Sequence, residues 1–183
     1  GFNVSDNLIV GPNVGGGLVI NGDFDAEPTR HDTPDGRLVS GNLVDGLGQG
    51  MTGMILRGGV YGTNVRDNEF TANGVNVFLS RTGAPGLPTV FEDNLIQGVH
   101  VLPGDHGIFL DDEARDGLDQ VHLVLTGNTI RDHSGSGIFA VNKSALSSVR
   151  IGDAADPGAG NAFFDNCRFN IELSREADNP LDL

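Results

Sequence analysis

The segment LTGNTIRDHSGSGIFAV, Leu125–Val141, contains the pattern from which the fold of this chain is inferred. Its first part places a hydrophobic residue, two small or polar residues, an asparagine and a second hydrophobic residue in a fixed order. After a polar gap, a glycine precedes the short apolar run IFA. Short runs of Val, Ile, Leu and Phe that are bounded by glycine and polar turns are typical of β-strands.

The same order of hydrophobic residue, Asp or Gly, asparagine and hydrophobic residue returns along most of the chain. Its asparagines are Asn7, Asn42, Asn68, Asn94, Asn128 and Asn161. They stand 26 to 35 residues apart, so the repeat accepts insertions of variable length. Stacked coils of a solenoid behave in this way, because stacking constrains the strands and tight turns while loops grow outward.

A second position of the repeat holds only glycine or asparagine. It comes directly before short apolar runs such as VFL, IFL and IFA, and its residues are Gly17, Gly53, Asn76, Gly107, Gly137 and Asn170. Two fixed columns that are joined by variable gaps indicate that successive coils lie in register.

The asparagine and the hydrophobic residue two places on share one face of a strand, and we expect both to point inward. A buried amide costs free energy unless its hydrogen bonds are made. Amides stacked about 4.8 Å apart in successive coils satisfy one another. The sequence therefore predicts an all-β, single-stranded parallel β-helix of about six to seven coils with an internal asparagine ladder.

In these residues the chain resembles right-handed parallel β-helix proteins of the pectate-lyase-like superfamily, over about six coils from Val4 to Leu173. That group includes pectate and alginate lyases, uronan epimerases, glycoside hydrolases, phage tailspikes and periplasmic proteins without catalysis. An antiparallel β-sandwich also uses short strands and glycine turns, but it predicts no asparagine register. Coils longer than about 26 residues argue against the short-coil left-handed β-helix.

Length and composition agree with one domain over residues 1–183, ending in a polar tail at 174–183. The chain opens at Gly1 without a methionine or a signal-peptide pattern, which suggests a part of a longer protein. No amphipathic helix precedes the first coil, and an open strand edge invites aggregation. We therefore expect further chain segments or another subunit to cap that coil.

Charge and apolar runs limit the partners that we expect. A net charge of −14 repels nucleic acid and anionic lipid, which both need a positive surface. No apolar run approaches the roughly 18 residues of a membrane span. We expect a polysaccharide partner, no nucleic acid and no membrane insertion. The resemblance implies an extracellular, periplasmic or cell-surface location.

A calcium site is the one cofactor site that the sequence suggests. Asn21, Asp23 and Asp25 alternate in an acidic insertion, at a spacing that oxygen ligands of Ca²⁺ share. Ala26 replaces the glycine of an EF-hand loop, so the predicted site is irregular. The alternative is a solvated turn, because Asp and Gly are ordinary turn residues. The histidines show no spacing of zinc ligands.

An insertion before one of the strands suggests a catalytic position. The gap from Asn94 to Gly107 exceeds the corresponding gap of the next coil, and its extra residues include LPGDHG. Asp105 and His106 therefore lie in a local bulge, and uneven loops are where solenoids usually place binding and catalysis.

Charged residues beyond the apolar runs form a second group of candidates. Two residues after each run, Arg81, Asp112 and Asn142 share one column in successive coils, and Lys143 follows in the last of these coils. Neighbours in such a column lie about one strand spacing apart, so we expect a mixed-charge cluster beside the bulge. The alternative is a set of surface salt bridges that need no substrate.

The resemblance gives this cluster a chemistry. In a polyuronate lyase or epimerase, a cation neutralises the sugar carboxylate and a base removes the proton at C5. The predicted catalytic residues are Asp105, His106, Asp111, Asp112 and Lys143, and the predicted substrate-binding residues are Arg81, Asn142, Arg131 and His133.

The motifs of the family are incomplete in this chain. GDHG at Gly104–Gly107 resembles only part of the G-H-G segment of polygalacturonase-like enzymes, and no N-T-D, R-I-K or D-P-H pattern accompanies it. Two functions therefore stay open. One is a secreted or envelope module that binds or processes polysaccharide, and the other is a structural or adhesion module without catalysis, such as a stalk, a fibre or a tailspike-like part.

Overall fold

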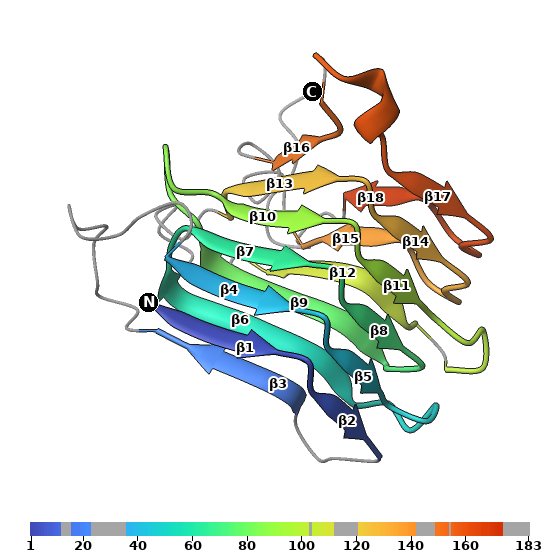
Figure 1. The fold of residues 1–183 in the computed structure, drawn as a ribbon. Coiled ribbons are helices and arrows are strands. Elements are labelled where there is room, and N and C mark those ends of the chain that lie inside the picture. Colours follow the sequence, from blue (N-terminus) through green and yellow to red (C-terminus); the bar gives the residue numbers. More distant parts are fainter. Residues whose placement is uncertain are drawn as a thin grey trace.

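In a computed structural model of the protein, the residues described are 1–11, 16–22, 36–102, 104–111, 121–141, 149–153 and 155–173. Within them the chain forms eighteen β-strands, one short 3₁₀ helix at Pro157–Ala159 and no α-helix. Figure 1 shows the strands as three sides of one stack, which rises from β1, β2 and β3 at one end to β16, β17 and β18 at the other. No helix in this part of the chain is long and apolar enough to cross a membrane.

Three parallel sheets of six strands make up the stack. Sheet A contains β1 (Phe2–Ser5), β4 (Arg37–Ser40), β7 (Thr63–Arg66), β10 (Thr89–Glu92), β13 (Leu123–Thr126) and β16 (Val149–Ile151). Sheet B contains β2 (Leu8–Val10), β5 (Leu43–Asp45), β8 (Glu69–Thr71), β11 (Leu95–Gln97), β14 (Thr129–Arg131) and β17 (Ala162–Phe164). Sheet C contains β3 (Gly16–Asn21), β6 (Thr52–Val60), β9 (Val75–Thr82), β12 (His106–Asp111), β15 (Ile138–Ala140) and β18 (Ile171–Leu173).

Each strand pairs with the strand three places later in the chain, which is the order that a parallel β-helix of six coils requires. The predicted parallel β-helix is thus confirmed. The apolar runs also stack as the sequence predicts. Their first residues, in register from coil to coil, are Leu18, Met54, Val77, Ile108, Ile138 and Ile171.

The asparagine ladder runs along the turns between sheets A and B. Each side-chain Nδ2 donates to the Oδ1 of the asparagine in the next coil, over 2.8 Å from Asn7 to Asn42 and 2.9 Å at the later steps. The backbone N–H of each asparagine donates to the same Oδ1 at 3.0 Å. The four central amides are buried. The predicted ladder is therefore confirmed.

The residue before five of the six ladder asparagines explains why the repeat uses Asp or Gly there, whereas Gly160, before Asn161, is extended with a φ of −67°. Asp6, Asp67 and Asp93 have φ values of 58°, 54° and 54°, and Gly41 and Gly127 have 63° and 67°. This left-handed conformation is unfavourable for most L-residues, but glycine adopts it freely and Asp tolerates it through local hydrogen bonds. The tight turn that aims the amide inward thus selects these two residue types.

Apolar side chains fill the interior in layers that follow the same register. Val65, Phe91 and Leu125 are fully buried from sheet A, and Phe70, Ile96 and Ile130 are fully buried from sheet B. Leu56, Leu79 and Leu110 provide the corresponding layer of sheet C. The core is aliphatic with two phenylalanine rings, as the low aromatic content of the chain suggests.

The outermost strands pair on one side only within the described residues. Leu8 is 69% exposed in the first coil, and Leu173 is 55% exposed in the last. The cap that we expect on the first coil stays a prediction, and the tail at 174–183 lies outside the described residues.

The glycine and asparagine column at the start of the sheet C runs supports a test of the fold. A Cβ added to Gly107 would lie 2.4 Å from the backbone oxygen of Gly137 and 2.9 Å from Cγ2 of Ile130. Because a backbone atom has little room to move, we expect Gly107→Ala to lower the free energy of unfolding by about 2 kcal/mol. Urea unfolding measures this loss. Gly158→Ala is the matched control, since its Cβ would meet only Oδ1 of Asp156, at 3.1 Å, among the described atoms. Equal stabilities of the two variants would contradict the packing described here.

Candidate functional site

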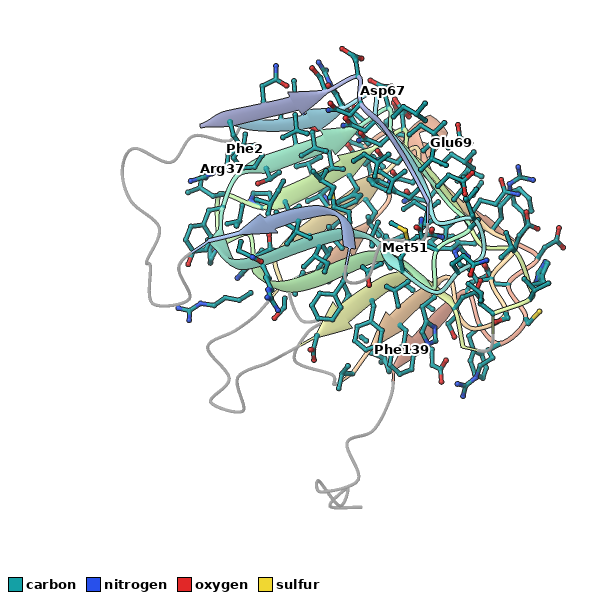
Figure 2. All side chains as sticks on the ribbon, turned by 90° about the horizontal axis from the view of Figure 1, so that it is seen from below. Phe2, Arg37, Met51, Asp67, Glu69 and Phe139 are labelled. Carbon is teal, nitrogen blue, oxygen red and sulfur yellow. The ribbon has the colours of Figure 1, made fainter. Side chains whose placement is uncertain are left out.

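The outer face of sheet C carries three phenylalanines, one from each of three successive coils. We call Phe78, Phe109 and Phe139 the Phe row; they lie in register on β9, β12 and β15. The ring centroids are 5.6 Å apart between Phe78 and Phe109 and 5.2 Å apart between Phe109 and Phe139. Figure 2 shows Phe139 at the margin of the molecule, on the outer side of its sheet. All three rings are half-buried, so the row forms an apolar strip that solvent reaches.

The Phe row follows from the alternation of side chains along each strand. Leu79, Leu110 and Ala140 point inward and are fully buried, so their neighbours in the middle of each run point outward. In the runs VFL, IFL and IFA, the middle residue therefore points outward, and this alternation is the sequence pattern that predicts the Phe row. As core strands alone, these runs do not predict the Phe row, which the structure reveals.

His106 extends the aromatic strip toward the turn that precedes sheet C. Its ring lies 4.5 Å from Phe139 and 6.0 Å from Phe109, measured between centroids. Nδ1 accepts a hydrogen bond from the backbone N–H of Ser136 at 3.1 Å, which assigns the neutral ring the tautomer with hydrogen on Nε2. Burial lowers the pKa of His106, against the nearby carboxylates of Glu172 and Asp105, which raise it. The neutral ring thus donates at Nε2.

The role of proton acceptor that the sequence suggests for His106 stays a prediction. In the tautomer described here, Nε2 already carries a hydrogen, and Nδ1 becomes a base only if it gives up the bond from Ser136. This tautomer leaves Nε2 of His106 as a hydrogen-bond donor, in a side chain that is 9% exposed.

Asp105 holds the bulge to the next coil. Its carboxylate accepts hydrogen bonds at Oδ1 from the backbone N–H groups of Ser134 and Gly135, the latter at 3.3 Å. The side chain is buried, and its Oδ2 has no hydrogen-bond partner within the described part of the chain. These contacts fix the position of the adjacent His106. A direct catalytic role of Asp105 stays a prediction.

A polar column borders the other side of the Phe row, two residues further along each strand of sheet C. Its members, in register, are Asn21, Arg57, Ser80 and Asp111. Arg81 follows Ser80 at the end of β9. The structure thus brings Asp111 and Arg81 to the same edge of the aromatic strip. Three further predicted members of this cluster, Asp112, Asn142 and Lys143, lie outside the described residues.

The predicted calcium ligands are only partly described. Oδ1 of Asn21 accepts a hydrogen bond from Nε of Arg57 at 2.9 Å, which places a cation beside the proposed ligand atom. Asp23 and Asp25 lie outside the described residues. Within the described ranges, no group of three His, Cys, Asp or Glu side chains is arranged to hold a metal ion. The calcium site stays a prediction.

Arg131 lies on the outer side of sheet B, away from the Phe row. Its Nη2 donates to Oε1 of Gln97 at 3.1 Å, and its guanidinium carbon lies 5.6 Å from the ring centroid of Phe164. The structure therefore separates Arg131 from the other predicted substrate-binding residues that it describes.

His133 is fully buried inside the stack. Its Nε2 lies 2.9 Å from Nδ2 of Asn76, and its Nδ1 lies 2.9 Å from Oδ1 of Asn166. The amide nitrogen of Asn76 can only donate and the oxygen of Asn166 can only accept, so the neutral ring carries its hydrogen on Nδ1. His133 links the buried Asn76 to the half-buried Asn166. Its buried position does not favour the substrate contact that we expected, which stays a prediction.

The bridge from His133 to Asn76 passes across an intervening coil. In that coil the column position is Gly107, whose added Cβ would lie 3.1 Å from Cε1 of His133. Because Gly107 has no side chain, the imidazole reaches the asparagine two coils away. Burial lowers the pKa of His133, against the bond from Asn166 and the nearby Asp105, which raise it.

An acidic depression lies at the turns between sheets A and B of the last coils. Its lining includes Glu92, Asp93, Asp153 and Asp156. Asp153 and Asp156 accept hydrogen bonds from the backbone N–H groups of Ala155 and Gly158, both at 2.9 Å. These are the usual contacts of aspartates in turns. The depression thus has an explanation without a ligand.

The chain matches no known family model, and searches of curated proteins and of solved structures returned no significant match. The resemblance to pectate-lyase-like proteins therefore stands on the residues and the fold.

Proposed function

We propose that this chain is a secreted or cell-envelope β-helix module that binds polysaccharide along the outer face of sheet C. The observation that supports this proposal is the half-buried Phe row, which lies between His106 on one side and the polar column that ends in Asp111 on the other.

The composition of this strip suits a sugar chain. A sugar ring has apolar C–H faces and a rim of hydroxyl groups, so it binds best where apolar side chains are flanked by a few polar groups. His106 offers the Nε2–H donor, and Asp111 offers acceptor oxygens. The strip repeats at short intervals, because one ring comes from each of three successive coils. A polysaccharide also repeats at short intervals, with one sugar ring after another.

Processing of the bound glycan, by a lyase, epimerase or hydrolase reaction, belongs to the same proposal. It rests on the predicted catalytic residues Asp105, His106, Asp111, Asp112 and Lys143, of which Asp112 and Lys143 lie outside the described residues. Binding is the part that the described side chains support.

The binding proposal is tested by Phe109→Ala, which removes the central ring of the row. Loss of a buried phenylalanine contact is worth about 1.5 to 3 kcal/mol, so we expect at least about tenfold weaker binding of the glycan that the wild type retains. Affinity electrophoresis against pectate, polygalacturonate, alginate and a neutral glucan, with and without Ca²⁺, identifies that glycan, and calorimetry measures the loss.

Phe164→Ala is the matched control, because Phe164 is a 41% exposed ring on sheet B. This variant should bind as the wild type does. A wild type that retains no glycan of the panel contradicts the proposal, as does a Phe109→Ala variant with wild-type affinity. Absorbance of unsaturated uronides and assays of reducing ends, made on the same samples, report processing separately.

The alternative is a structural or adhesion module without catalysis. The exposed side chains of the outermost strands favour this alternative, since such ends suit the stacking of further coils. Light scattering distinguishes the two proposals. A strict monomer at high concentration that retains a glycan supports the first, and concentration-dependent assembly without glycan binding supports the second.

A further inference from the structure

Three turns between sheets B and C bring a thiol, an imidazole and a carboxylate together. They come from successive coils and carry His100, Asp132 and Cys167. Sγ of Cys167 lies 3.4 Å from Nδ1 of His100, and Nε2 of the same ring lies 3.6 Å from Oδ1 of Asp132. This is the order of nucleophile, base and orienting acid that activates a nucleophile in enzymes.

The carboxylate and the ring are each held from more than one side. Oδ2 of Asp132 accepts a hydrogen bond from Nε2 of Gln97 at 3.0 Å, and Nη1 of Arg131 lies 3.5 Å from it. The backbone N–H of His100 donates to the carbonyl of Asp132 at 3.3 Å. Both His100 and Asp132 adopt left-handed φ values, 55° and 62°, which are uncommon for residues other than glycine.

The same contacts assign the proton positions. The carboxylate of Asp132 favours hydrogen on Nε2 of His100, which leaves Nδ1 as the acceptor for the thiol proton. A cysteine reacts as its thiolate, so removal of this proton is the activating step. The groups in direct contact with His100 and Asp132 are Cys167, Gln97 and Arg131.

The surroundings of Cys167 favour one class of reaction. The thiol is exposed, so a small reagent reaches it. Acyl transfer would need N–H donors for the developing oxyanion. The backbone N–H groups of Cys167 and Arg168 already donate to the carbonyls of His133 and Gly135, at 2.8 Å and 3.1 Å. Thiol–disulfide exchange needs no such donors, because the leaving group carries the charge away.

We propose that Cys167 is a base-assisted site of thiol–disulfide exchange, which takes small disulfides as its substrate. His100 accepts the thiol proton, and the thiolate attacks one sulfur of the disulfide. A bond forms between Sγ and that sulfur, the original S–S bond breaks, and the departing thiolate takes the proton from His100. The products are a mixed disulfide on Cys167 and one free thiol, and the disulfide itself is the oxidant.

The test is the rate at which Cys167 reacts with 4,4′-dithiodipyridine, a neutral disulfide whose released thiopyridone is followed by absorbance. At pH 7 we expect the wild type to react about tenfold faster than His100→Gln, because the variant lacks the base. The reaction rate of Asp132→Asn should lie between the rates of the wild type and His100→Gln. At pH 10 the three rates should converge, since hydroxide in the solvent then takes the place of the base. Glutathione disulfide should add its mass to the wild type and not to Cys167→Ser.

His122→Ala is the control for loss of a histidine elsewhere, and its rate should equal that of the wild type. Equal rates of the wild type and His100→Gln at pH 7 would overturn the proposal. A rate difference that persists unchanged at pH 10 would also overturn it, because it would report altered access to the thiol and not loss of a base. Unaltered circular dichroism of the variants shows that their fold is retained.

Discussion

Replacing Asn94 by leucine should lower the free energy of unfolding by about 4 kcal/mol, although the two side chains are similar in size. Oδ1 of Asn94 accepts from the backbone N–H and from Nδ2 of Asn68, at 3.0 and 2.9 Å. Nδ2 of Asn94 donates to the carbonyl of Val65 at 2.8 Å and to Asn128 at 2.9 Å. The leucine removes all four contacts and leaves the backbone N–H of Asn68 buried without its acceptor, which costs about 1 to 3 kcal/mol. Each of the other lost hydrogen bonds costs about 1 kcal/mol, although Nδ2 of Asn68 and Oδ1 of Asn128 keep further backbone partners.

Urea unfolding measures the loss, and the melting temperature should fall by about 10 °C. Asn3→Leu is the matched control, because Asn3 is exposed on β1. It should change stability by less than about 0.5 kcal/mol. An Asn94→Leu variant that melts with the wild type would contradict the ladder. Glycan retention, measured on the folded variant, should stay at the wild-type level, since Asn94 is internal.

A His133→Leu variant should lose about 3 kcal/mol of stability at neutral pH. Leucine fills much of the space of the imidazole, so cavity formation contributes little. The main cost comes from Nδ2 of the buried Asn76, which loses its 2.9 Å partner, while Oδ1 of the half-buried Asn166 keeps the backbone N–H of residue 133 at 3.3 Å. Chemical denaturation at pH 7.5 measures this cost. Wild-type stability in the variant would show that the bridge across Gly107 contributes nothing.

His133 also makes the stability of the wild type sensitive to acid. Burial lowers the pKa of His133 from its ordinary value of 6.5, partly offset by Asn166 and Asp105. The unfolded chain therefore binds a proton near pH 6.5 that the folded chain still excludes. The contribution of neutral His133 to the free energy of unfolding is fully present above pH 6.5. It is lost as the pH falls toward the lower pKa of His133 in the folded chain. Protonation would also put an N–H on Nε2 against the amide nitrogen of Asn76.

Melting temperatures at pH 7.5 and pH 5 test this dependence. Between pH 7.5 and pH 5, the melting temperature of His133→Leu should fall less than that of the wild type. Part of the fall that remains in the variant comes from His106, whose pKa is also lowered by burial. Asn3→Leu is the control, because Asn3 is exposed on β1 and carries no titratable group, so the fall in melting temperature should stay unchanged. The same fall in His133→Leu and in the wild type would contradict the assignment to His133.

The fold could be predicted from the sequence because each coil repeats the same physical problem. A left-handed turn needs Asp or Gly, and a buried amide needs a copy of itself, so Asp93 and Asn94 recur in recognisable form. The in-register runs follow from the same stacking. The loops carry no such constraint, which is why Asp112 and Lys143 could be placed in a column only by extrapolation from the strands before them.

The candidate site was less predictable, for reasons that differ from residue to residue. Phe109 belongs to a run that reads as core, and only the alternation of its neighbours shows that it points outward. His133 stands in a polar turn that looks exposed. It is buried because Gly107, in another coil, leaves room for its ring. Cys167 meets His100 through turns of unequal length, and no fixed spacing in the sequence records that meeting.

The hydrogen bonds of the ladder all run in one direction, from Asn7 toward Asn161. Their amide dipoles therefore add, and the column has an acceptor end at Asn7 and a donor end at Asn161. A coil that joins the column before Asn7 must supply an N–H, and one that joins after Asn161 must supply an oxygen. Two copies can then share a continuous ladder only head to tail. Such a contact is heterologous, and it builds an open filament instead of a closed pair.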